Sequence, residues 1–130
     1  MTVQDIKKLV HYWADQVPDA LETAHALFRS GKFHYCLFFC HLAAERMLKA
    51  LVVNATKEHA PFTHNLVFLA GKADLDADAD QLHLLESLNE WCLMARYPTS
   101  RKILETKATK NYAASLLKET ENFIAWLQRR

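Results

Sequence analysis

The sequence contains very little glycine, proline and cysteine. Only two Gly and three Pro occur in 130 residues, which excludes collagen-like chains and argues against disorder and hairpin-rich β folds. The three Cys form an odd number, which argues against a disulfide framework and favours reduced thiols in a core. An excess of charge of one sign is also missing. Because the formal net charge is +1, nucleic acid would have to bind at a local patch.

Extended hydrophobic runs are missing as well. The uncharged run at residues 33–44 is too short to span a membrane and contains two His. The opening residues, MTVQDIKKLVHYW, contain no apolar signal core. We therefore expect a soluble, cytoplasmic protein that does not interact with membranes.

Hydrophobic residues make up 51% of the chain, and they recur at helical spacing. The predicted helical segments are Thr2–Arg29, Gly31–Asn54, His64–Ala70 and two more at about residues 80–97 and 108–128. Pro18 predicts a kink or a break near Gln16 to Val17. The stretch PTSRKILETK is interpreted as a polar, basic link. These features predict an all-α fold: one domain, residues 1–130, built as an antiparallel up-and-down bundle of four long helices and one short helix.

Several residues suit particular helix ends. Thr2 is a predicted N-cap of the first segment, and Thr63 is a predicted N-cap of the short one. Gly31 suits the left-handed conformation past a helix end, and Gly71 is a predicted stop. Pro98 is expected to end the helix before it, because the residue preceding a proline avoids helical geometry.

The segment Gly31–Asn54 is apolar on nearly every side, so neighbours must cover it. Its polar residues His34, His41 and Glu45 form a narrow seam at helical spacing. His41 and Glu45 are four residues apart, an arrangement that can raise the pKa of an imidazole or supply two metal ligands. Because HExxH and other zinc spacings are absent, we predict no metal and no cofactor. The seam is then a helix contact, a subunit interface or part of a nucleotide or RNA site.

Two other groups have a structural and a functional interpretation. Cys36 and Cys40 form a helical CxxxC, which is a redox or metal pair in one interpretation and core packing in the favoured one. His64 either contacts an anion at the start of the short helix or belongs to a capping turn, and the turn is favoured.

A basic stretch follows the fourth predicted helix. Arg96, Tyr97, Arg101 and Lys102 offer cations and an aromatic ring suited to a phosphate or a splayed base. The alternative is that Arg96 neutralises the end of a helix while its neighbours are simply solvated.

The order of several motifs resembles the HEPN domain family. They are Trp13 in an early helix, G-K-F…C-H-L-A-A-E-R-M-L-K-A-L (residues 31–51), P-F-T-H-N-L (61–66) and L-x-x-L-N…A-R-Y-P (85–98). The resemblance implies a helical bundle that forms a homodimer. It also implies a gene beside a minimal nucleotidyltransferase, with which the protein forms a toxin–antitoxin or nucleotide-handling pair.

Many HEPN proteins are metal-independent RNases with an Arg followed after four to six residues by His. Arg96 matches the Arg, but Arg101, Lys102 and Ile103 occupy the positions of the His, and no His follows His83. RNA cleavage through the 2′-hydroxyl needs a group that exchanges a proton near neutral pH, which Arg cannot do.

We therefore predict a module that binds or regulates through nucleotide or RNA phosphate, with the binding residues Arg96, Tyr97, Arg101, Lys102, His34 and His41. The alternative is an endoribonuclease toxin that uses Arg96 with a displaced His, for which His41 and Glu45 are catalytic candidates beside His34.

Overall fold

The computed structural model describes residues 1–93 and 98–130, without the side chains of residues 93 and 98–101. This part of the chain forms seven helices: α1 (Val3–Ala14), α2 (Val17–Arg29), α3 (Phe33–Thr56), α4 (Leu66–Lys72), α5 (Ala79–Leu93), α6 (Pro98–Lys107) and α7 (Lys110–Gln128). Since the described residues contain no strand, the predicted all-α class is confirmed. None of the helices in these two ranges is long and apolar enough to cross a membrane.

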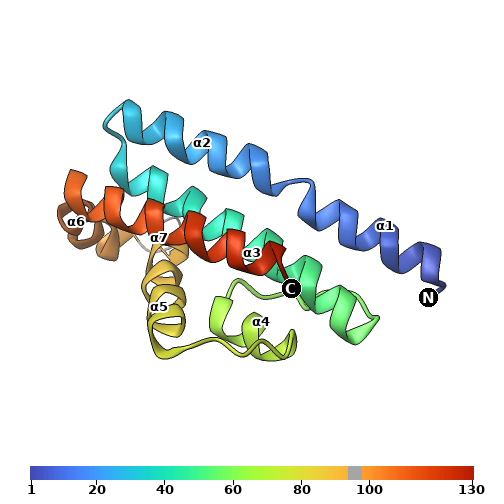
Figure 1. Cartoon of the computed structure of the whole chain (residues 1–130). Helices are drawn as coiled ribbons and strands as arrows, with labels where there is room; N and C mark the ends of the chain where they lie inside the picture. Colours follow the sequence, from blue (N-terminus) through green and yellow to red (C-terminus); the bar gives the residue numbers. More distant parts are fainter. Residues whose placement is uncertain (94–97) are drawn as a thin grey trace.

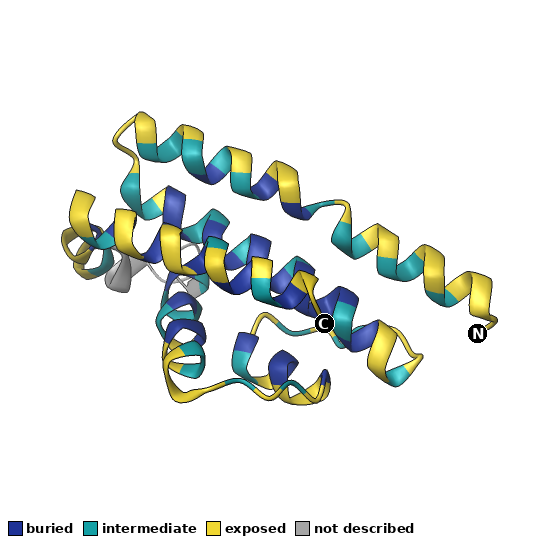
Figure 2. Cartoon of the chain, in the orientation of Figure 1, coloured by how far each residue is buried: buried dark blue, intermediate teal, exposed yellow. Residues whose placement is uncertain are grey.

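Helix α3 is the centre of the bundle. It packs against each of the other six helices described, and Figure 1 shows α2 and α7 beside its N-terminal part and α1 beside the rest. Most of its residues are buried, whereas its neighbours expose one face each (Figure 2). The prediction from its all-round apolar pattern is confirmed.

The first predicted segment is broken into α1 and α2. Pro18 lies in the first turn of α2, where a missing backbone N–H costs no hydrogen bond, so the chain breaks at Asp15 and Gln16 as one of the two predicted outcomes. Thr2 caps α1 as predicted, in a reciprocal capping box with Asp5. Helix α1 contains no buried residue, and in Figure 2 its outer face is exposed along its whole length.

The predicted link PTSRKILETK is wrong, because this stretch forms helix α6. Proline is favoured at the first position of a helix, so Pro98 begins a helix here. Leu104 packs against the core, which gives the polar segment a buried side. Lys107 then donates to Glu90 of α5 at 2.8 Å, and this carboxylate raises the pKa of the Lys107 ammonium. The prediction that the preceding helix runs to Tyr97 falls on residues outside the described part.

Two predicted helix ends are also corrected. Asn65 rather than Thr63 caps α4, because its side-chain oxygen reaches the N–H groups of Val67 and Phe68. Gly71 does not stop α4, which continues to Lys72. Gly31 does have the predicted left-handed conformation, with φ at +76°.

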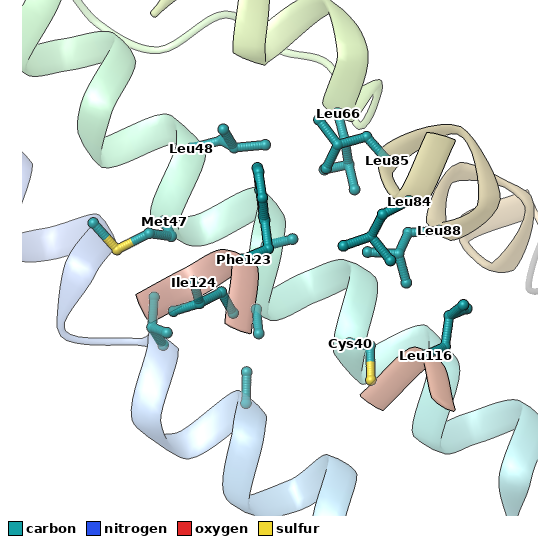
Figure 3. Close-up of a cluster of buried hydrophobic side chains, with 14 of the residues drawn as sticks. Cys40, Met47, Leu48, Leu66, Leu84, Leu85, Leu88, Leu116, Phe123 and Ile124 are labelled. Atoms are coloured by element: carbon teal, nitrogen blue, oxygen red, sulfur yellow. The ribbon is translucent and has the colours of Figure 1, made fainter. Parts of the chain in front are cut away.

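The core is formed where side chains of α3, α4, α5 and α7 meet. Figure 3 shows Leu66 beside Leu85, with Phe123 of α7 pointing toward Leu48. Trp91 is fully buried as well, a placement that the periodicity of α5 did not reveal. Cys36 and Cys40 are buried free thiols, as the core interpretation predicted.

Candidate functional site

The structure divides the predicted seam into two places. His41 and Glu45 are almost completely buried, at 2% and 3% exposed. His34 is seven residues earlier on α3, about 10 Å along the helix axis, and its side chain is partly exposed. The seam therefore does not act as one group.

His41 is fixed by the loop that precedes α4. Its Nε2 donates to the carbonyl oxygen of His64 at 2.8 Å, so the other ring nitrogen, Nδ1, carries no proton in the neutral imidazole. Nδ1 lies 3.9 Å from Oε1 of Glu45, which is too long for a hydrogen bond. Burial lowers the pKa of His41 and outweighs the opposing effects of the His64 carbonyl and Glu45. Glu45 does act to raise the pKa, as its spacing from His41 allows, but the net shift is downward.

Glu45 is the centre of a buried polar network. Its Oε1 accepts from Nδ1 of His64 at 2.8 Å, and its Oε2 lies 3.2 Å from Nζ of Lys49. Lys49 is itself buried, and its ammonium lies 5.0 Å from the centre of the Trp13 ring on α1. Arg46 lies 5.4 Å from the same ring. The network joins α1, α3 and the loop before α4.

Two asparagines extend this network to α5. The side-chain oxygen of Asn89 accepts from the backbone N–H of Leu66 at 2.9 Å, and its amide donates to the Asn65 side chain at 3.1 Å. Asn89 and Lys49 were not among the functional residues predicted from the sequence. The signal was present in both cases, because Lys49 follows Glu45 of the seam by four residues, and Asn89 is a polar residue between Leu85 and Cys92 on one face of α5.

His34 lies at the other end of the candidate site, beside α6. Its Nε2 is 3.8 Å from a carboxylate oxygen of Glu105, and its ring contacts that of Tyr35 with 4.1 Å between centroids. Lys102 is exposed on the same helix as Glu105. Arg96 and Tyr97 are outside the described residues, and nothing is described of the Arg101 side chain.

The chemistry open to the histidines follows from these positions. His41 is buried, and its Nε2 is already used in a hydrogen bond, so it is not placed to exchange protons with a substrate. His34 and His64 are the partly exposed members of the group. Across residues 1–93 and 98–130, no group of three His, Cys, Asp or Glu side chains is arranged to hold a metal ion.

Two clefts of the molecule lie away from this region. One of about 450 Å³ is lined by α1 and His59. The other, about 480 Å³, lies between α2 and α7, where His25 and Glu121 are 3.1 Å apart. Neither contains a residue predicted to bind phosphate, and both are open hollows without a buried polar group aimed into them.

Comparison with known proteins agrees with this architecture. The crystal structure of TT1696 from Thermus thermophilus superimposes with a TM-score of 0.79 at 20% identity, covering 92% of this chain and 96% of that one. This likeness shows the fold. No curated protein matches the chain significantly. The HEPN domain model matches residues 10–130, which include every residue of the buried network and both ends of the candidate site. The chain therefore belongs to the HEPN domain family.

Proposed function

We propose that this HEPN protein is a binding and regulatory module that recognises nucleotide or RNA phosphate without cleaving RNA. Membership of the HEPN family supports a role connected with nucleotides or RNA. The sequence has an Arg at position 96 but no His where the RNase motif requires one.

The observation that carries this proposal is the position of His41. A displaced His can replace the missing one only if its ring reaches substrate. The ring of His41 is 2% exposed, and its Nε2 donates to a backbone carbonyl. Of the two histidines that the seam offers for acid–base work, His41 therefore has a structural role.

The binding surface that we propose lies where the start of α3 meets α6. His34 and Lys102 are on these two helices, and α6 begins two residues after Arg96 in the sequence. Arg96, Tyr97 and Arg101 belong to the same proposed surface. Two arginines, a lysine and an aromatic ring suit a phosphate and its base.

We also propose that the protein forms a homodimer and pairs with a minimal nucleotidyltransferase, in the manner of a toxin–antitoxin system. HEPN proteins often act as dimers or with partners, which supports this proposal. Co-expression with the neighbouring gene product should yield a complex that survives size-exclusion chromatography. Elution of the two proteins separately at micromolar concentration would contradict the pairing.

One observation favours a second candidate, an endoribonuclease. His34 lies against α6, the helix that follows Arg96, and its ring is partly exposed. Of the two histidines in the seam, His34 is therefore the one placed to supply the missing proton-transfer group.

A single set of assays separates these functions. Binding of labelled single-stranded RNA and of nucleotides is measured beside RNA cleavage in EDTA, for the purified chain and for Arg96→Ala, Lys102→Ala and His34→Ala. Lys7→Ala and His83→Ala, at exposed positions on α1 and α5, serve as matched controls. Binding without cleavage that weakens in the first three variants supports the module. Cleavage lost in Arg96→Ala and His34→Ala establishes the RNase instead.

A further inference from the structure

We propose that Phe62 and His64 form a second subsite, which binds one unpaired nucleotide of RNA. Both residues lie in the loop between α3 and α4, outside the surface proposed at α6. This inference rests on the proposed role in nucleotide or RNA binding and adds to it a second contact point.

Phe62 is the most exposed large hydrophobic residue among those described. Its side chain is fully in solvent. An aromatic ring in this position contributes nothing to the core, and its face is available to stack on a base. Phe68 offers a comparison within the same region, since it is only 41% exposed and the ammonium of Lys72 lies 5.9 Å from its ring centre.

His64 is held in one orientation by a buried carboxylate. Its Nδ1 lies 2.8 Å from Oε1 of Glu45, while about half of its side chain is exposed. Glu45 is fixed in turn by Lys49 at 3.2 Å. Nε2 of His64 makes no hydrogen bond within the described part of the chain. A carboxylate behind one ring nitrogen thus leaves the other nitrogen, already oriented, for a ligand.

Nε2 of His64 can bind a nucleotide in two ways. As an unprotonated acceptor it takes a hydrogen bond from a ribose hydroxyl, and as part of an imidazolium it donates to a phosphate oxygen. Because the orientation is set by groups inside the bundle, binding does not have to order this side chain, which lowers its entropic cost.

The two side chains are close enough to serve one nucleotide. They are two residues apart, so their Cα atoms are within about 7 Å of each other in any backbone conformation. Thr63, between them, makes two local hydrogen bonds. Its backbone N–H donates to the Pro61 carbonyl at 3.0 Å, and its hydroxyl oxygen accepts from the Asn65 N–H at 3.1 Å. The loop therefore holds its own shape.

RNA fits this loop better than a protein partner does. Protein interfaces bury a contiguous patch with an apolar centre. Here the exposed positions 57–59, 64 and 65 are polar or charged, and the apolar Ala60 and Pro61 are small and only partly exposed, so Phe62 has no other large apolar side chain within this loop. A single stacking ring beside an oriented imidazole matches a base and its sugar or phosphate.

The test measures binding of labelled single-stranded RNA to the full chain by fluorescence anisotropy. In His64→Asn, the amide nitrogen takes the place of Nδ1 and keeps the hydrogen bond to Glu45, while Nε2 is lost. Phe62→Ala removes the ring. We expect each variant to weaken binding about fivefold or more, with a thermal unfolding midpoint close to that of the unchanged protein. Phe68→Ala and His83→Asn are the matched controls and should bind like the unchanged protein.

The outcomes separate this subsite from the proposed function. Binding that is lost in Arg96→Ala but retained in Phe62→Ala and His64→Asn overturns the subsite alone. Loss of RNA binding in only one of the two loop variants overturns the proposal that Phe62 and His64 act together in one subsite. No RNA binding by the unchanged protein overturns the subsite, and no binding of either RNA or nucleotides overturns the proposed function as well. Intact RNA binding in Phe62→Ala with loss of a protein partner identifies the loop as a protein contact and also overturns the subsite.

Discussion

His64 and Glu45 are joined by a hydrogen bond of 2.8 Å that connects a half-exposed ring to the interior of the bundle. Their positions in the sequence differ by 19. The same carboxylate also holds the ammonium of Lys49, so one buried side chain fixes the loop before α4 and neutralises a buried cation.

Glu45→Ala is expected to be strongly destabilising. It leaves Lys49 buried without its anionic partner and removes the acceptor of His64. Breaking a buried ion pair by removing one partner costs about 3–5 kcal/mol in the free energy of unfolding. Urea denaturation followed by circular dichroism measures this loss.

The double variant Glu45→Leu with Lys49→Met provides the control. Because it removes both charges and fills their volume, it should recover most of the stability lost in Glu45→Ala. A loss below about 1 kcal/mol in the single variant would show that the pair is effectively solvated.

Stability should fall in mild acid because of His41. Burial holds the pKa of this imidazole in the folded chain below the ordinary value of 6.5. Below that pH the unfolded chain binds a proton that the folded chain resists, so the contribution of His41 is fully present above about pH 6.5 and declines as the pH drops through the folded pKa. Urea midpoints taken from about pH 7.5 to about pH 5 follow this decline.

His41→Gln tests whether His41 causes the decline. Glutamine places an amide N–H near the position of Nε2 and retains the donor to the His64 carbonyl, but it does not titrate in this range. The midpoints of this variant should vary less with pH than those of the unchanged protein. Identical slopes for the two proteins would assign the acid sensitivity to other groups.

The N-cap of α4 depends on Asn65. Its side-chain oxygen accepts from two backbone N–H groups of α4 and from the Asn89 amide. Asn65→Ala should lower the free energy of unfolding by about 1 kcal/mol or somewhat more, whereas Asn65→Asp keeps the acceptor and should cost less. Equal losses in the two variants would mean that the cap contributes little.

Substitution of alanine for the two glycines should change the free energy of unfolding in opposite directions. Gly31 has φ at +76°, so Gly31→Ala should cost about 1–2 kcal/mol. Gly71 is helical, and an added Cβ would meet no atom within 4 Å. Gly71→Ala should therefore stabilise the protein by about 0.5 kcal/mol, since alanine loses less backbone entropy in a helix. Thermal unfolding of the two variants side by side measures both signs.

The sequence predicted the features that depend on local pattern. The apolar circumference of residues 31–54 identified the central helix, and Thr2 and Gly31 were assigned correctly because each acts on its own helix end. Helix α6 was missed because Pro98 was interpreted only as the end of one helix, although proline also suits the start of the next.

The contacts of the candidate site were less accessible to prediction. The periodicity grouped His34 with His41 and Glu45, but it carried no information on which element covers each residue. His41 and Glu45 lie under the loop before α4, whereas His34 lies beside α6. Their environments, and therefore the direction of the His41 pKa shift, depend on the path of that loop.

Helix α1 contributes no buried residue, and Val10, Trp13 and Ala14 pack only partly buried against the core, so less apolar contact holds it to α3 than holds α2 or α7. It should open as a unit of its own, far more often than the whole bundle unfolds. Amide hydrogens of α1 would then exchange with deuterium through this partial opening, whereas exchange in the middle of α3 would require global unfolding. The N-terminal helix is thus the part of the fold where a protease, or a partner that prefers the detached form, gains access first.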